Sequence, residues 1–268
     1  MNGSYKIQAS INFKKNDQHM QIFTPKKLSE SIAYKNFWFP GRWVGGVSLC
    51  IAPVVFLTGI LLRIQFHFFF PQQLLAFSHH STLIVASYNC FVTGNILLWP
   101  AVITLATIIG QTKPQLALWG GCFVIFGLFA RTFHAGIDHL AFQLVRVQGL
   151  DTAQKAIADA YGGFNIIATL NGTILTGWCI LAAGAYLSGT LSLARSIALA
   201  AMSLLMMGVL KGSSWVSVTA ATGLCIALVP LGLKVLREGP IPAYKTIITR
   251  TILITAVIAF LYFLGQQG

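Results

Sequence analysis

Seven long apolar segments constrain the fold of this chain more than any other feature of its sequence. A helix rises about 1.5 Å per residue, so about 20 mostly apolar residues are needed to cross the hydrocarbon core of a bilayer. Helices are favoured there because every backbone polar group in lipid must find its partner within the protein. The segments are residues 44–62, 82–109, 116–145, 163–187, 192–210, 215–236 and 246–264. We therefore predict an all-α fold, a polytopic membrane bundle of about seven transmembrane helices.

The composition excludes a water-soluble globule. Of the 268 residues, 56% are hydrophobic and only 9% are charged, whereas roughly a quarter of the residues in a soluble domain are charged. The five cysteines all fall inside apolar segments and lack the paired spacing of a zinc or redox motif. They are Cys50, Cys90, Cys122, Cys179 and Cys225. We interpret them as small packing residues.

Two regions are predicted. Residues 1–43 form a basic cytoplasmic segment, in which residues 24–35 are expected to form an interfacial helix, because Thr24 and Pro25 make a helix start and Leu28 and Ile32 share one face. Residues 44–268 form the transmembrane domain. Within it, the aromatic segment 64–81 contains Pro71 and is expected to include an interfacial or re-entrant helix.

The basic residues predict the orientation. The chain has 18 Lys and Arg against 6 Asp and Glu, a formal net charge of +12. With the N-terminus inside, thirteen of these cations fall on the inner side and four on the outer side, which satisfies the positive-inside rule. The four are Arg63, Arg146, Lys155 and Lys211, and Arg131 lies within a span. We expect a multi-pass protein of a bacterial inner membrane with its C-terminus outside, membrane lipid as a partner and no nucleic-acid partner, because no binding module is present.

The third segment carries the strongest functional signal. On a helix that turns about 100° per residue, Arg131, His134 and Asp138 fall on one stripe, while His139 is displaced from it by about 80°. Charges at this depth cost several kcal/mol each unless they face protein, water or one another. We therefore predict an outward-facing buried site. Asp138 would act as an acid or ligand, His134 as a base or ligand, and Arg131 as a partner for an anion.

This cluster leads to a functional hypothesis, a membrane-embedded enzyme that acts on a lipophilic or membrane-associated substrate by acid/base or metal-assisted chemistry. Aromatic and polar residues on neighbouring segments are expected to enclose the substrate. They are Phe133, Phe142, Tyr161, Asn165 and Trp215.

The cofactor is open at this point. His67, His79, His80 and His139 fall toward the same outer side and, with the cluster, offer ligands that suit zinc, iron or copper. The guanidinium of Arg131 would oppose such a cation. A non-covalent haem is a further alternative, since no CxxCH attachment site is present.

Two other functions use the same residues. In a transporter or proton-coupled carrier, the cluster would bind a solute or relay protons; broken helices would favour this function, and Pro100 and Pro230 are the candidate breaks. In a non-catalytic partner subunit, Arg131 and Asp138 would neutralise each other, with His134 between them, and would lock the packing of the helices.

Overall fold

All regular structure is helical in the computed structural model, which describes residues 38–160, 166–205, 208–238 and 243–266. Six helices in this part of the chain are long and apolar enough to cross a membrane. They are α3 (Arg42–Leu62), α5 (Ser81–Gly110), α6 (Pro114–Gln148), the continuous pair α8 (Ile166–Thr169) and α9 (Asn171–Leu187), α11 (Trp215–Arg237) and α12 (Tyr244–Gly265). They coincide with six of the predicted spans. The helix expected at 24–35 lies outside the described residues.

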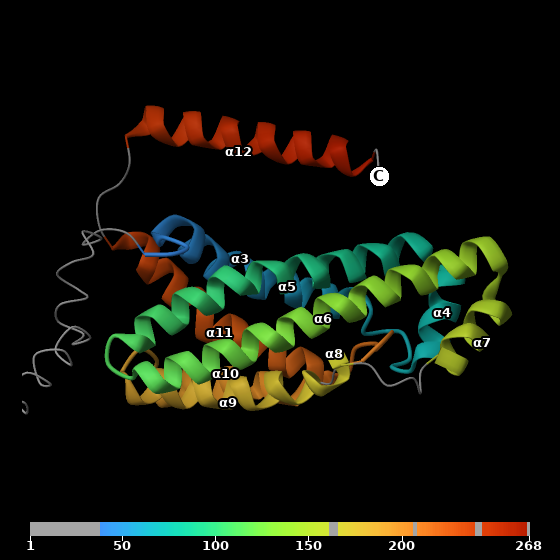
Figure 1. Cartoon of the computed structure of the whole chain (residues 1–268), viewed down its shortest axis with the longest axis horizontal. Coiled ribbons are helices and arrows are strands. Elements are labelled where there is room, and N and C mark those ends of the chain that lie inside the picture. The colour runs from blue at the N-terminus through green and yellow to red at the C-terminus, as the bar shows by residue number, and fades with distance from the viewer. Residues whose placement is uncertain (1–37, 161–165, 206–207, 239–242, 267–268) are drawn as a thin grey trace, which may run out of the picture.

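Local sequence explains where several helices begin. Proline occupies the first turn of α6 and of α4 (Phe70–His79), where its missing N–H costs nothing. Helix α11 begins with a capping box, in which the Ser214 side chain accepts a hydrogen bond from the Ser217 backbone N–H. Helix α4 confirms the expected helix between the first two spans, and α7 (Leu150–Ala160) follows α6 at the same end of the bundle (Figure 1).

The long helices α3, α5, α6, α9 and α11 run side by side; the first four alternate in direction, and α11 runs in the same direction as α9 (Figure 1). Gly46 near the start of α3 packs against Gly232 near the end of α11, and Gly120 early in α6 packs against Leu181 late in α9. One end of the bundle, here the Arg42 end, holds Arg42, Gly110, Pro114, Leu187 and Arg237. The opposite end, here the Leu62 end, holds Leu62, Ser81, Gln148 and Trp215.

The segment predicted as the fifth span differs from the prediction. It forms α10 (Leu193–Ala200) and the 3₁₀ helix η2 (Ala201–Leu204), which together rise only about 20 Å, short of the roughly 30 Å of a bilayer core. Of the residues that follow, 205 and 208–214 are described and are not helical, and Ser214 then caps α11 at the Leu62 end. This segment, here called the discontinuous crossing, is therefore not one spanning helix in its described part, and the described helices that can span a membrane number six.

Backbone geometry shows why the helix does not continue. Gly208 has φ +146° and Leu210 has φ +50°, and neither value fits a right-handed helix. A non-glycine residue at positive φ costs on the order of 1–3 kcal/mol and persists only where its surroundings hold it. By contrast, α5 and α11 continue through Pro100 and Pro230. In the described chain the helical structure thus stops at Leu204 and resumes at Trp215, and it is not interrupted at either proline.

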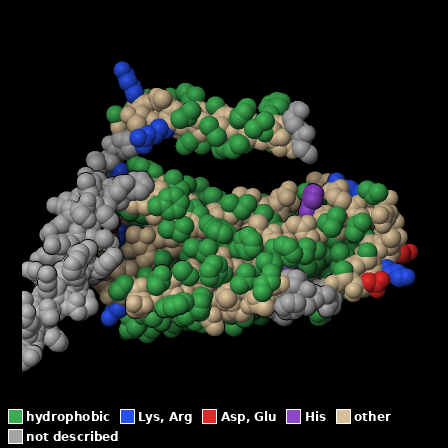
Figure 2. Space-filling view, in the orientation of Figure 1, with side chains coloured by type: hydrophobic (Ala, Val, Ile, Leu, Met, Phe, Trp, Pro, Cys, Tyr) green, Lys and Arg blue, Asp and Glu red, His purple; other side chains and the backbone are tan. Residues whose placement is uncertain are grey.

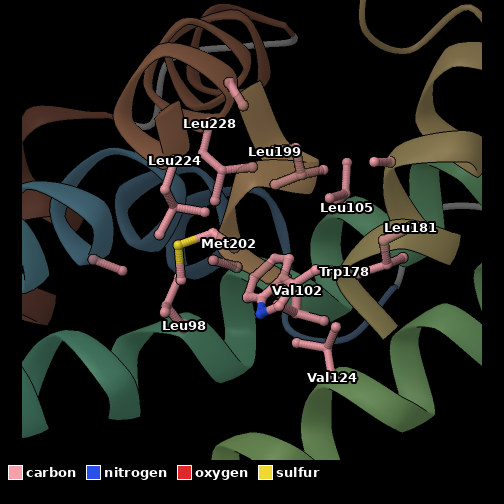
Figure 3. Packing of buried hydrophobic residues seen from close by; sticks show 14 of the residues in the cluster. Leu98, Val102, Leu105, Val124, Trp178, Leu181, Leu199, Met202, Leu224 and Leu228 are labelled. Atoms are coloured by element: carbon pink, nitrogen blue, oxygen red, sulfur yellow. The ribbon is translucent and has the colours of Figure 1, made fainter. Parts of the chain in front are cut away.

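The short fifth element lies in the centre of the hydrophobic core. Leu199 and Met202 are fully buried, and Figure 3 shows them among side chains from α5, α6, α9 and α11. Those neighbours include Leu98, Val102, Trp178 and Leu224. Apolar packing thus supports the inward face of the discontinuous crossing, while Ile197 and Leu204 on its other face are exposed.

Helices α3 and α5 approach closely next to the site described below. A Cβ atom on Gly59 would lie 2.5 Å from the Phe91 backbone nitrogen, so only glycine fits there. Ser87 Oγ donates a hydrogen bond to the Gly59 carbonyl oxygen over 2.6 Å. Small residues and such interhelical hydrogen bonds are typical of helix packing in membranes.

The surface agrees with a membrane setting. Hydrophobic side chains cover the visible flank of the bundle, and charged side chains gather toward its two ends (Figure 2). None of the residues of α12 is buried, and within the described structure this helix contacts no other element; it lies apart from the bundle in Figure 1.

Candidate functional site

A cavity of about 30 Å³ lies inside the Leu62 end of the bundle. By this measure a water molecule needs about 10–15 Å³, so there is room for about two water-sized groups. The walls come from α3, α5, α6, α11, the segment before α4 and the discontinuous crossing. The lining residues are Ile60, Arg63, Phe68, Tyr88, Phe91, Arg131, His134, Ala135, Asp138, Leu205, Gly208, Lys211, Gly212 and Ser217.

The three residues predicted to share a stripe on the third span all line this cavity. Arg131, His134 and Asp138 are 5%, 8% and 7% exposed. They do not form the neutralising pair that a packing lock would need, because the only ion pair within 4.0 Å among the described residues joins Lys234 to Glu238. Arg131 and Asp138 therefore line the same cavity without contacting each other as an ion pair.

Asp138 fastens the discontinuous crossing to α6. Its Oδ1 atom accepts a hydrogen bond from the Leu210 backbone N–H over 2.5 Å. Leu210 is fully buried and has the positive φ described above. Strained backbone of this kind is concentrated at functional sites, and here it brings a main-chain donor to the buried carboxylate.

Arg63 is a second buried guanidinium, which the sequence analysis assigned to an outer loop. It directly follows α3, is 4% exposed and donates from Nε to Ser213 Oγ over 3.1 Å. Its guanidinium lies 4.5 Å from the Tyr88 ring centroid and 4.6 Å from that of Phe91. Such cation–π contacts hold the group in a fixed position.

Arg131 is held in a similar way. Its guanidinium lies 5.5 Å from the ring centroid of Phe56 and 5.8 Å from that of Phe91. Arginine stays protonated in proteins, so two positive charges lie around one phenyl ring. Nη1 and Nη2 of Arg131 and Nη1 of Arg63 are buried and have no hydrogen-bond partner among the described residues.

His134 is oriented by the next helix. Its Nε2 atom lies 3.2 Å from Asn171 Oδ1 on α9. Because an amide oxygen only accepts, Nε2 carries the proton in this arrangement and Nδ1 keeps its lone pair. Nδ1 is buried without a partner among the described residues. A base held by a third group in this way is a common arrangement at catalytic sites.

A second cavity, of about 50 Å³, adjoins the first between α5 and α6. Tyr88, Ala135 and Asp138 line both. Its remaining walls are mixed, with Val85, Val92 and Phe142 beside the polar Asn89 and His139. Phe142 stacks on Phe77 with ring centroids 4.5 Å apart. Asp138 thus lies on the wall that the two cavities share.

The other predicted substrate residues are not brought together. Phe133 is 40% exposed and Trp215 is 76% exposed, and neither lines a cavity described above. Of the three that the structure describes, only Phe142 lines a cavity, the second one. Tyr161 and Asn165 lie outside the described residues.

The histidines proposed as metal ligands are also not gathered into one site. His67, His79, His80 and His139 are exposed, and among the described residues no three His, Cys, Asp or Glu side chains come together as a metal would require. The rings of His67 and His80 lie beside phenylalanines instead. Histidines at the same end of the bundle can therefore have side chains that point in different directions.

Several cavity residues were missed by the sequence analysis. They are Arg63, Tyr88, Leu210, Lys211, Gly212 and Ser217. Only the two cations could have been recognised from the sequence, because each is a charged residue next to an apolar or aromatic run. Both were interpreted as charges that set the membrane orientation.

The fold and the site together define a class, a helical bundle of the multi-pass membrane type with a buried, charged cavity near one end. No family model, curated protein or solved structure matches the chain.

Proposed function

We propose that this protein is a membrane-embedded enzyme that acts on a lipophilic substrate by acid/base chemistry. The observation that carries the proposal is the convergence on one cavity of an oriented imidazole, a buried carboxyl group and two guanidinium groups that form no ion pair within 4.0 Å among the described residues. A nearby base, acid and set of charge-stabilising donors is what such chemistry requires.

Each residue has a role that follows from its contacts. His134, oriented by Asn171, accepts a proton from the substrate at Nδ1. Asp138, fixed by the Leu210 N–H, donates a proton to another atom of the substrate, so one proton is removed and one is added. Arg63 and Arg131 stabilise the negative charge that develops, an effect that is strong where water is excluded.

The lipophilic character of the substrate is supported by the second cavity. Val85, Val92 and Phe142 form an apolar part of its lining, beside the polar His139, and it shares Asp138 with the charged cavity. Exposed Asn89 on α5 also borders it. An apolar chain in this space would leave the reacting group of the substrate beside Asp138.

The proposed orientation keeps the N-terminus and the Arg42 end in the cytoplasm, with seven crossings if the discontinuous one is counted. Arg63 and Lys211 line the cavity, so the exposed cations of the Leu62 end reduce to Arg146 and Lys155, which are accompanied by exposed Asp151 and Asp159. The positive-inside rule then places this end outside, in the periplasm if the membrane is a bacterial inner membrane.

A labelling experiment tests this orientation. In whole cells, a Lys155→Cys variant is expected to react with a membrane-impermeant maleimide, because α7 lies at the proposed outer end. An Arg195→Cys variant, on exposed α10 surface at the opposite end, is expected to react only after the cells are opened. The native chain, with its five cysteines, supplies the background. The reverse pattern would overturn the orientation.

A carrier is the second candidate, and the discontinuous crossing favours it. Half-helices that end beside a charged cavity within the membrane are characteristic of secondary transporters, and η2 ends next to Leu205, which lines the cavity. A carrier would move an added solute into sealed proteoliposomes without changing it chemically. An enzyme would release a chemically altered product.

The enzyme proposal is tested by searching for that product. Native protein in nanodiscs is incubated with a polar lipid extract, and the lipids are compared by mass spectrometry before and after incubation. The same assay is made on the Asp138→Asn, His134→Ala double variant. A product that forms at the native rate with the folded double variant would contradict the proposed roles.

A further inference from the structure

The charged cavity has an excess of positive charge. Among the described residues, its lining includes three cationic side chains, Arg63, Arg131 and Lys211, and one carboxylate, Asp138. The two guanidinium groups alone thus outnumber the carboxyl group of Asp138 among the described lining residues. Uncompensated charge in a membrane protein is expensive and is usually matched by a partner.

The two arginines present donors that no protein group uses. Three guanidinium nitrogens, Nη1 and Nη2 of Arg131 and Nη1 of Arg63, are buried and unpartnered among the described residues. Phe56, Phe91 and Tyr88 fix the two groups from the side, and Ser213 takes the Nε donor of Arg63. The remaining N–H groups are thus held in place beside the cavity.

We propose that this cavity binds an oxyanion, the charged end of a phosphate or carboxylate group, between Arg63 and Arg131. This inference rests on the proposed function, because it takes the same cavity as the substrate site. It adds that the substrate carries an oxyanion. Planar guanidinium groups match the paired oxygens of these anions and bind them by charge-assisted hydrogen bonds. A space for about two water-sized groups suits two such oxygens.

Neighbouring residues agree with this assignment. Lys211, which lies 5.5 Å from the Phe68 ring centroid, adds a third positive charge to the same wall. Asp138 does not compete for the donors, because its Oδ1 atom is bound to the Leu210 N–H and no ion pair within 4.0 Å joins it to either arginine among the described residues. The oxyanion comes either from a lipid headgroup or from a free solute.

The test uses full-length protein in phosphatidylcholine nanodiscs. Added inorganic phosphate, at constant ionic strength set with chloride, is expected to raise the melting temperature of the native protein. Arg131→Gln is expected to weaken the apparent affinity for phosphate about tenfold or more, since a lost charge-assisted hydrogen bond costs that factor. Arg195→Gln is the matched control, because it removes the same charge from exposed surface, and it should respond as the native protein does.

A second arm separates the two sources. If the oxyanion is a headgroup, native mass spectrometry after exposure to mixed lipids is expected to show phosphatidylglycerol retained by the native protein. Arg131→Gln and Arg63→Gln should lose this lipid. Stabilisation by phosphate without retained lipid identifies a free anion. Arg131→Lys, which keeps the charge but loses the planar donor pair, replaces Arg131→Gln if that variant does not fold.

Stabilisation by phosphate or retention of phosphatidylglycerol supports the site if the arginine variants lose it. A native protein that shows neither response, or arginine variants that respond fully, would overturn it. Because binding is measured without turnover, the oxyanion site stands if the double variant at Asp138 and His134 disproves the catalytic roles but phosphate still binds.

Discussion

The Asp138→Asn, His134→Ala double variant is expected to lose product formation in lipid nanodiscs by about 10⁴-fold or more, while remaining folded. A positioned acid or base contributes about 10²–10⁴-fold to a rate, and groups that act as a unit are not additive. The asparagine keeps an oxygen that can accept the Leu210 N–H hydrogen bond. The variant therefore removes the two groups that can exchange protons, and it keeps the hydrogen bond that joins the crossing to α6.

The control for this loss is Asp159→Asn, His79→Ala, which makes the same chemical changes at exposed positions. It should form product at the native rate and melt at the native temperature. If the control loses activity as severely as the double variant, the loss does not come from the cavity. If the Asp138→Asn and His134→Ala single variants both retain native rates, neither side chain transfers a proton.

Replacing Gly212 by valine is expected to abolish the site by moving one wall of the cavity. A Cβ atom at this position would lie 2.8 Å from the Phe68 Cα atom and 2.6 Å from Gln73 Nε2. The Gly212 N–H also donates to the Phe68 carbonyl over 2.8 Å, so the two segments cannot separate without losing this bond. Overpacking of this kind costs about 1–3 kcal/mol.

Three measurements check this prediction on one preparation, namely the melting temperature, the rate of product formation and the phosphate response. All three are expected to fall in Gly212→Val, the last two below detection. Gly172→Val is the matched control, because a Cβ atom there meets nothing within 4 Å. Native product formation by Gly212→Val would show that the wall formed by residues 208–214 is not part of the site.

The long helices could be predicted because apolar length is a local property of the sequence. Residues 215–236 were predicted as a span and α11 covers Trp215–Arg237; residues 82–109 were predicted and α5 covers Ser81–Gly110. The segment 192–210 has the same apolar length but does not form one long helix. Its break depends on the backbone at Gly208 and Leu210 and on the Asp138 contact, which are set by tertiary structure.

The candidate site was predictable to the extent that it lies on one helix. Helical spacing alone brought Arg131, His134 and Asp138 to one stripe, and all three line the cavity. Arg63 could not be found in this way, because its burial depends on Tyr88 and Phe91 of α5 and on Ser213, which are distant in the sequence. The sequence predicted a charge on the outer side, and the structure buries that charge beside the cavity.

The histidines predicted as metal ligands lie apart for a related reason. Assigning histidines to the outer side fixes only the end of the bundle at which they lie. His79 and His80 are at the end of α4, while His139 faces a different direction from His134 on α6, and all three are exposed. The cavity instead gathers guanidinium groups, which repel a metal cation and attract an anion.

The most direct test of the central claim, that this charged cavity is a working site and not a packing lock, is a paired measurement on the Arg131→Met, Asp138→Asn double variant. Asparagine keeps an oxygen that can accept the Leu210 N–H hydrogen bond, and methionine removes a buried charge that costs several kcal/mol to hold away from water. We predict an unchanged or higher melting temperature together with the loss of both product formation and the phosphate response. A large drop in melting temperature, with native product formation in the fraction that remains folded, would contradict the claim.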